Sequence, residues 1–217
     1  MNVLNETRVP KEKYKLKTNV LIAAGILVFG IVMGVFSKYL DISYENLPVF
    51  LDSLDDLLNL HVFFDGFSPW VVLGLGICIY SPRPFNAAVN IYVFFCSFLA
   101  SYYIYGISTV NEWPAGYSLV VWGGLAILSP LIGYFCWYAK GDGVLAIIVS
   151  SGFIGFLMNT TFDYGFWYFE VKSLMEVFML VLGIYILRRN VRESLFIVCF
   201  AVPFGIFMKM VIPFGIW

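Results

Sequence analysis

Charged residues are scarce in this chain of 217 residues. Asp, Glu, Lys and Arg make up 12% of the sequence and hydrophobic residues 61%, whereas a typical soluble domain is about 25% charged. This composition excludes an ordinary water-soluble domain. The 13 basic and 14 acidic residues nearly cancel, so the basic surface that nucleic-acid binding requires is also lacking. The sequence therefore predicts an integral membrane protein that lies in a lipid bilayer.

Histidines and closely spaced cysteines are also lacking. His61 is the only histidine, which excludes a metal centre built from several histidines. The four cysteines lie inside apolar runs without paired short spacing, so neither a zinc site nor a secreted disulfide framework is indicated. We expect small buried hydrophobic residues at Cys78, Cys96, Cys136 and Cys199. No metal and no cofactor is predicted.

Motifs of common hydrolases are absent as well. The chain has no HExxH, no GxSxG and no adjacent pair of glutamates, which are patterns that carry known catalytic chemistry. Because catalytic groups can also assemble from distant positions, an intramembrane enzyme is kept as a third hypothesis. The sequence favours a protein that is not an enzyme.

Long apolar runs are what the sequence does contain. A helix needs about 20 apolar residues to cross roughly 30 Å of hydrocarbon. We predict an all-α transmembrane bundle of about seven spans, which forms a single domain over residues 19–217 after a basic N-terminal segment, residues 1–18. The predicted spans are 20–39, 63–80, 85–105, 117–138, 143–158, 171–187 and 195–217.

The basic residues predict the orientation of the bundle, because Lys and Arg near short loops are retained in the cytoplasm. A cytoplasmic N-terminus and an external C-terminus place ten of the thirteen basic residues inside. The compact chain with its short loops favours the cytoplasmic membrane of a prokaryote. The ten residues are Arg8, Lys11, Lys13, Lys15, Lys17, Arg83, Lys140, Arg188, Arg189 and Arg192.

The outer connections are longer than the inner ones, and binding residues concentrate on loops held by a rigid scaffold. The first of them carries an amphipathic pattern over residues 48–62. Asp52, Asp55 and Asp56 share one helical face, and leucine and phenylalanine fill the other. Pro48 suits the first turn of a helix. We predict a helix in the outer interface or folded back over the bundle, with a solvated acidic face.

Four charged residues lie in or near the outer halves of the last two spans: Asp163, Lys172, Glu176 and Lys209. An ionisable group at the centre of a span costs about 2.5 to 3.5 kcal/mol and is a candidate for function. Three interpretations are open. Lys209 reaches the headgroups while Glu176 pairs with Lys172, Glu176 pairs with Lys209 between helices, or the residues bind a ligand or ion.

Aromatic residues gather near the predicted outer boundary, Tyr103, Trp113, Tyr164 and Trp167 among them. One interpretation is an interfacial belt of tyrosine and tryptophan. The other is an aromatic-lined pocket that opens to the outside and suits a flat, apolar or cationic small molecule.

Small and polar residues also occur within the spans. Pairs of small residues one helical turn apart permit close helix packing. Asparagines in a span form hydrogen bonds between helices or line a polar path, and we favour the first. These residues are Gly30 with Gly34, Ser151 with Gly155, and Asn86 with Asn90.

In size and span count the chain is similar to the substrate-binding subunits of vitamin uptake systems and to small transporters with three spans, a linker span and three spans. The likeness is one of architecture alone. We predict binding of a small molecule from the outer side and a part in its transport, because the inner turns are short, the outer connections are long and rich in aromatic residues, and Glu176 and Lys209 lie within spans. The alternative is a non-catalytic interaction or immunity protein that contacts another polypeptide. A partner membrane protein or a second copy of the chain is compatible with both.

Overall fold

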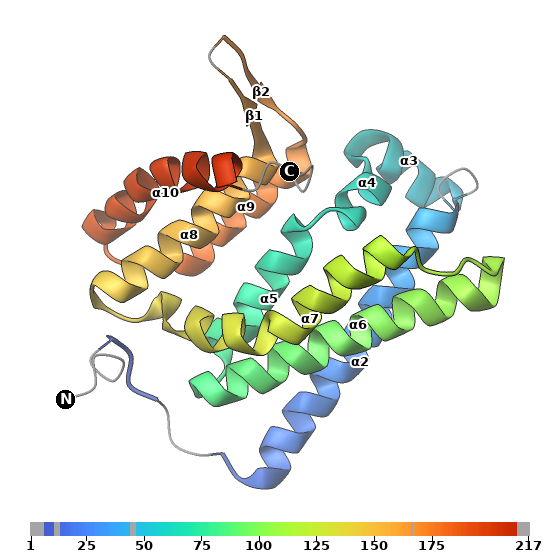
Figure 1. Ribbon diagram of the computed structural model, residues 1–217, viewed down its shortest axis with the longest axis horizontal. Coiled ribbons are helices and arrows are strands. Elements are labelled where there is room, and N and C mark those ends of the chain that lie inside the picture. The colour runs from blue at the N-terminus through green and yellow to red at the C-terminus, as the bar shows by residue number, and fades with distance from the viewer. Residues whose placement is uncertain (1–6, 11–13, 44–46, 166, 212–217) are drawn as a thin grey trace.

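The computed structural model describes residues 7–10, 14–43, 47–165 and 167–211 and consists of helices with one small hairpin (Figure 1). The elements are α2 (Leu16–Ser43), α3 (Val49–Leu58), α4 (Leu60–Asp65), α5 (Ser68–Tyr80), α6 (Pro84–Val110), α7 (Gly116–Cys136), η1 (Trp137–Lys140), α8 (Gly143–Thr161), β1 (Phe162–Tyr164), β2 (Phe169–Val171), α9 (Leu174–Leu187) and α10 (Val191–Val211).

Five helices among the described residues are long and apolar enough to cross a membrane: α2, α6, α7 with η1, α8 and α10. The prediction of an all-helical membrane bundle is confirmed to that extent. The remaining apolar helices, α5 and α9, have 13 and 14 residues, which is fewer than the roughly 20 that a full crossing requires. The last six residues of the predicted seventh span, 212–217, lie outside the described part of the chain.

The second predicted span, 63–80, is not one helix. Asn59 takes a left-handed conformation with φ of 50° and separates α3 from α4. Gly66 then ends α4 in an extended conformation, and α5 begins at Ser68. The amphipathic helix predicted at 48–62 is therefore confirmed only over α3. Asp55 is buried rather than solvated, because its carboxylate accepts bonds from the backbone N and Nδ1 of His61 (2.9 and 2.7 Å).

The connection predicted at 159–170 contains a β-hairpin. Strands β1 and β2 pair antiparallel, with Asp163 opposite Glu170, and α9 starts only at Leu174, three residues later than the predicted span. Aromatic residues on both sides of a glycine suit such a hairpin. The side chain of Ser173 then accepts a hydrogen bond from the backbone N of Met175 and caps α9. Figure 1 shows the hairpin projecting beyond the end of the bundle.

The bundle contains two triplets of helices with the same internal packing. In the first triplet, α2, α5 and α6, a Cβ added at Gly34 of α2 would overlap the backbone O of Phe98 on α6. In the second, α8, α9 and α10, a Cβ added at Gly155 of α8 would lie 2.8 Å from the backbone O of Ala201 on α10. The first and third helices of each triplet thus approach through small residues, as the sequence predicted.

The two triplets meet through their short middle helices. Leu180 and Leu187 of α9 belong to the same buried cluster as Trp70 and Leu75 of α5. We call α2, α5, α6 and α7 with η1 the first lobe, and α8, α9 and α10 with the hairpin the second lobe. Figure 1 shows α7 beside α5 and α6, with α5 on the side that faces the second lobe.

Basic side chains cap the helices at one end of the bundle. The Arg8 guanidinium lies 4.1 Å from the centre of the Trp137 ring and donates to the backbone O of Trp137 and of Ile79 (2.5 and 2.9 Å). Arg189 donates to the backbone O of Ala139. These bonds satisfy carbonyls that a helix C-terminus leaves without partners. We call this the arginine end, and the opposite end, which carries α3, α4 and the hairpin, the hairpin end.

Candidate functional site

Four of the predicted ligand residues come together at the hairpin end, in what we call the hairpin cluster: Asp163, Tyr164, Lys172 and Lys209. The Lys209 Nζ lies 2.8 Å from Asp163 Oδ1 and donates to the backbone O of Tyr164 at 3.0 Å. It also lies 4.3 Å from the centre of the Tyr164 ring. The hydrogen bond from Lys209 lowers the pKa of the Asp163 carboxyl below its ordinary value.

Asn159, which is 1% exposed, holds this cluster to the bundle. Its Oδ1 accepts from the hydroxyl of Tyr164 at 2.6 Å, and its Nδ2 donates to the backbone O of Gly205 at 2.8 Å. The Lys172 Nζ donates to the backbone O of Asn159 at 3.1 Å, and partial burial lowers the pKa of that amine. Each of these groups already has a partner within the chain, so the cluster anchors the hairpin to α8 and α10.

The hypothesis of a Glu176–Lys209 pair is wrong. Glu176 Oε1 accepts from the hydroxyl of Ser68 on α5 at 2.7 Å, while Lys209 pairs with Asp163. The alternative pair of Glu176 with Lys172 is not among the ion pairs of the described residues. The long side chain of Lys209 reaches the hairpin. The sequence did not predict this contact, because a plain loop was expected between the two spans.

The predicted aromatic residues do not form one pocket. The hydroxyl of Tyr103 lies 3.0 Å from that of Ser118 and joins α6 to α7. Trp113 and Trp167 are 71% and 97% exposed. Tyr164 belongs to the hairpin cluster. The four side chains thus lie at separate places on the hairpin end.

The two asparagines of α6 form hydrogen bonds between helices, as predicted. Asn86 Nδ2 donates to Asn19 Oδ1 on α2 at 3.1 Å. Asn90 Nδ2 donates to the hydroxyl of Ser81, at the end of α5, at 3.0 Å. The backbone O of Ser81 accepts from Trp137 Nε1 at 2.8 Å. These contacts hold the arginine end of the first lobe together.

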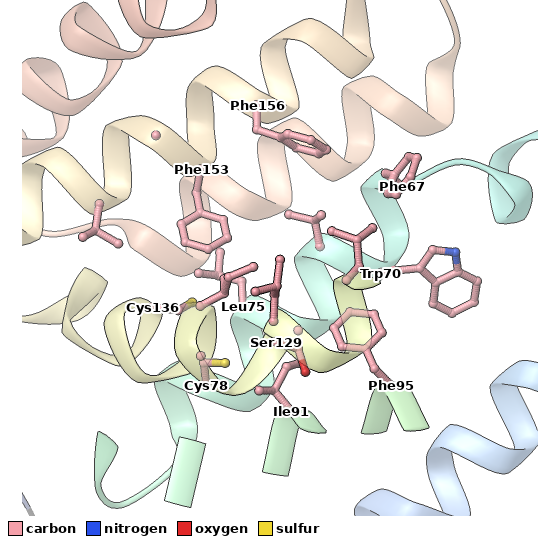
Figure 2. A pocket seen from close by; sticks show the side chains of 18 of the residues that line it. Phe67, Trp70, Leu75, Cys78, Ile91, Phe95, Ser129, Cys136, Phe153 and Phe156 are labelled. Carbon is pink, nitrogen blue, oxygen red and sulfur yellow. The ribbon is translucent and has the colours of Figure 1, made fainter. Parts of the chain in front are cut away.

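A cavity of about 690 Å³ lies between the two lobes. We call it the inter-lobe cavity. Its walls come from α5, α6, α7, α8 and α10, and the lining is apolar and rich in aromatic rings. Figure 2 shows Phe153 and Phe156 on one side and Trp70, Ile91 and Phe95 on the other.

Aromatic rings and thiols mark the two ends of this cavity. Toward the hairpin end, the rings of Phe67 and Trp122 stack with centroids 4.3 Å apart and planes 17° apart. Toward the arginine end lie the buried thiols of Cys78 and Cys136. Ser129 also lines the cavity, but its hydroxyl donates to the backbone O of Ala126 at 2.8 Å. The lining therefore favours contact with an apolar molecule.

The residues of the inter-lobe cavity include none of the ten that sequence reasoning selected. Those ten were chosen because they carry charge, polarity or boundary aromatic rings. The cavity is built instead from apolar side chains and small residues of five helices, which are the residues that any membrane helix uses for packing. The sequence carries one signal for this cavity, which is the pair of large aromatic residues Phe67 and Trp122 near the ends of the predicted spans 63–80 and 117–138. No cluster of metal-binding side chains occurs in the described residues.

Comparison with protein-family models, curated proteins and solved structures finds no significant match for this chain.

Proposed function

We propose that this protein binds a small apolar molecule in the inter-lobe cavity, receives it from the outer side and contributes to its transport. The observation that carries the proposal is the cavity itself. Its volume of about 690 Å³ lies within the roughly 300 to 1,000 Å³ of ligand pockets. Its lining offers aromatic faces and aliphatic side chains, so the ligand class is a flat or chain-like hydrophobic compound.

The orientation proposed for the bundle places the arginine end in the cytoplasm and the hairpin end outside. Support comes from the basic side chains that cap the arginine end, Arg8, Lys140 and Arg189, because cytoplasmic loops are rich in Lys and Arg. In this orientation the stacked Phe67 and Trp122 rings lie toward the outside.

The seven-span topology counts α5 and α9 as spans. At 1.5 Å per residue, α5 covers about 20 Å, which is less than the hydrocarbon thickness. α5 lies inside the bundle, where the other helices reduce its contact with lipid, and α9 packs against it while exposing Phe178, Val181 and Tyr185. α4 and the hairpin extend the two helices toward the outer side. Residue burial supports this arrangement, since Trp70, Leu75 and Cys78 of α5 are almost fully buried.

The repeated packing of the two triplets supports a role in transport. Transporters built from internal repeats hold their substrate between the repeats and expose it by moving one repeat against the other. Here α7 links two triplets of similar construction, and the inter-lobe cavity lies between them. This is the geometry in which movement of the second lobe changes access to the cavity.

A cavity-filling variant tests the binding proposal. A Cβ added at Gly124 meets nothing within 4 Å, and Gly124 lines the cavity. Gly123 has the same free space on the same helix but does not line the cavity. We expect fatty alcohols, linear isoprenoids or fused-ring aromatics to raise the thermal stability of the wild-type protein and of Gly123→Leu in detergent. Gly124→Leu should lose that response.

Two outcomes contradict the binding proposal. One is stabilisation by sugars or amino acids and not by apolar compounds. The other is an equal response of Gly123→Leu and Gly124→Leu, which places the ligand elsewhere. For transport, a compound that passes this test is followed in reconstituted vesicles, where Gly124→Leu should reduce its uptake to the level of vesicles without protein.

A second candidate function is contact with another polypeptide, and the hairpin favours it. Trp167 is 97% exposed at the tip, and Phe169 of β2 is also exposed. Exposed aromatic side chains of this kind are typical of interaction sites. If this function is correct, affinity purification recovers a stoichiometric partner with the wild-type protein and not with Trp167→Ser. Recovery of the same partner with both proteins excludes the hairpin tip as the contact.

A further inference from the structure

The two lobes are joined differently at the two ends. At the arginine end, Lys140 Nζ donates to the backbone O of Ile186 at 2.9 Å, and the Ser150 hydroxyl donates to the backbone O of Ala139 at 2.8 Å. Arg189 adds a bond to the same carbonyl. At the hairpin end, the hydrogen bonds of the described residues include a single one between the lobes, from Ser68 on α5 to Glu176 on α9 at 2.7 Å. The hairpin end is therefore the end that separates more easily.

The Ser68–Glu176 bond lies beside the inter-lobe cavity. Ser68 is fully buried and directly follows Phe67, whose ring stacks on Trp122 at that end of the cavity. Figure 2 shows Phe67 at the edge of the cavity, across from Phe156 of α8. The cavity is already partly open and α9 contributes no side chain to its lining. Movement of α9 away from α5 therefore acts through Ser68 and Phe67, and it widens the cavity at its hairpin end.

The Glu176 carboxyl is only half satisfied. Oε1 accepts from Ser68, but Oε2 is buried and has no hydrogen-bond partner among the described residues. The hydroxyl of Thr160 lies close enough to interact with the carboxyl, but in this structure it donates to the backbone O of Leu157 at 3.0 Å. The hydroxyl of Thr161 donates to the backbone O of Glu176 itself at 3.1 Å. A buried carboxylate oxygen without a donor is costly, and a neutral carboxylic acid removes most of that cost.

The surroundings of Glu176 contain little positive charge. Lys172, before α9, is the charged group that acts on it electrostatically, and its amine is held by the backbone O of Asn159. On α4, the charged groups that act electrostatically on the Asp65 carboxyl are Asp41 and Lys38, rather than Glu176. The groups that face the carboxyl from α5 and α8 are hydroxyls, which do not titrate near neutral pH. Proton binding is thus the available way to neutralise Glu176 while the lobes stay together.

We propose that Glu176 binds a proton when the lobes are closed at the hairpin end, and that loss of this proton separates α5 from α9 there and widens the cavity. The ionised carboxylate gains hydration only when water enters between the lobes. Acid pH therefore favours the closed form and rising pH favours the open form. The inference rests on the proposed function, because it treats the inter-lobe cavity as the ligand site.

A buried cysteine of the cavity reports opening without any ligand. Cys78 lines the cavity, and replacing Cys96, Cys136 and Cys199 with alanine leaves it as the single thiol. The measurement is the rate of its reaction with N-ethylmaleimide in reconstituted protein, in this background and with Glu176→Gln added. Ionisation of the thiol affects both proteins equally, so the ratio of the two rates isolates the effect of Glu176.

The expected ratio of the background rate to the Glu176→Gln rate is close to one in acid and rises with pH. One proton linked to opening produces up to about tenfold per pH unit. A ratio that stays constant from about pH 5 to about pH 9 overturns the proposal. A ratio that responds to Na⁺ at constant pH, rather than to pH, replaces the proton with a sodium ion and also overturns it.

A second pair of variants keeps the test decisive if Glu176→Gln does not fold. Ser68→Ala removes the bond between the lobes and should raise the labelling rate of Cys78 severalfold at acid pH. Ser108→Ala is the matched control, because the Ser108 hydroxyl is exposed and donates to the backbone O of Tyr105 in its own helix. Equal rates in the two variants contradict the proposal.

The tests of the proposed function and of Glu176 can fail independently. A pH-dependent ratio without binding of apolar compounds refutes only the proposed function, whereas binding of apolar compounds with a constant ratio refutes only the role of Glu176.

Discussion

Polar side chains within this apolar bundle form bonds at short range, and a charged residue in a helix is therefore a weak sign of a binding site here. Lys38 is buried, yet its Nζ lies 2.7 Å from Asp41 and 2.6 Å from Glu112. Lys209 is similarly bound by Asp163 and Tyr164. Glu176 differs from both lysines, because one of its buried oxygens has no donor among the described residues.

A charge swap tests the pair that the structure forms. Lys209→Asp and Asp163→Lys should each lower the thermal unfolding temperature in detergent by a few degrees, since each places like charges together. The double variant should recover most of the loss. Additive losses without recovery contradict the Lys209–Asp163 pair, and recovery in Lys209→Glu with Glu176→Lys points instead to the pair that the structure does not form.

The same ion pair predicts a dependence on pH. Lys209 lowers the pKa of Asp163 below its usual 3.8, so the folded state holds the carboxylate ionised more strongly than the unfolded state does. The stabilisation is complete above the unfolded value and is lost as pH falls through the lower folded value. Thermal melts of wild-type protein and Lys209→Met should therefore differ at neutral pH, and the difference should begin to shrink as pH falls below about 4.

The two hydrogen bonds of the Asn159 side chain lead to a further prediction. Asn159→Ala removes the buried hydrogen bond from α8 to the backbone O of Gly205 on α10, and it also leaves the Tyr164 hydroxyl without its acceptor. The expected cost is about 1 to 3 kcal/mol in the free energy of unfolding, measured by unfolding in mixed detergent micelles. Tyr164→Phe, which removes only the hydroxyl bonded to Asn159, should cost less. A loss in Asn159→Ala no greater than in Tyr164→Phe contradicts the role of the Gly205 contact.

At the scale of elements, close helix pairs depend on small residues at the contact. Gly30 and Gly34 allow α2 to reach the backbone of α6, and Gly155 and Gly205 allow α8 to reach α10. Ser151 adds a hydrogen bond from its hydroxyl to the backbone O of Ile197 at 3.2 Å. Without a hydrophobic force between helices in lipid, such close contact is a principal source of association. The same device in both triplets explains why they are built alike.

Two glycines of α2 provide a matched test of this packing. A Cβ at Gly34 overlaps the backbone of α6, whereas a Cβ at Gly25 meets nothing within 4 Å. Gly34→Ala should destabilise the protein by about 1 to 3 kcal/mol, as overpacking does. Gly25→Ala should be neutral or slightly stabilising, because alanine favours the helix. Unfolding in mixed detergent micelles measures both, and equal effects exclude the close α2–α6 contact.

At the scale of the whole molecule, the two lobes border an apolar space that is partly open, since lining side chains such as Leu128 and Ile132 are exposed. The orientation decides from which side its hairpin end is reached. The arginine end is fastened by bonds from Arg8, Lys140 and Arg189, while the hairpin end carries the single bond of Glu176 among the described residues. With the hairpin end outside, access from the outer side requires less to be broken than access from the cytoplasm.

Cysteine labelling tests this orientation. In a variant without the four native cysteines, Trp113→Cys and Trp167→Cys should react with a membrane-impermeant maleimide added to intact cells, because both positions are exposed at the hairpin end. Lys140→Cys, at the arginine end, should react only after the cells are opened. The opposite pattern reverses the orientation, and it also moves the proposed entrance of the cavity to the cytoplasmic side.

Composition and short-range spacing determined much of this protein. The bilayer environment, the helical class, the amphipathic helix α3 and the small-residue contacts of Gly34 and Gly155 all follow from the sequence. Each depends on residues within a few helical turns, or on hydrophobicity summed along a segment, and these quantities are present in the chain before it folds.

Only the tertiary structure decided the partner of Lys209 and the place of the cavity. Lys209 lies 46 positions from Asp163. The β-hairpin that brings them together is not visible in the hydrophobic pattern of any one span. The inter-lobe cavity combines side chains from five helices. The cavity exists because these helices do not touch at this place. Hydrophobic periodicity identifies the apolar side chains of each helix, but it does not specify which of them lack a neighbour.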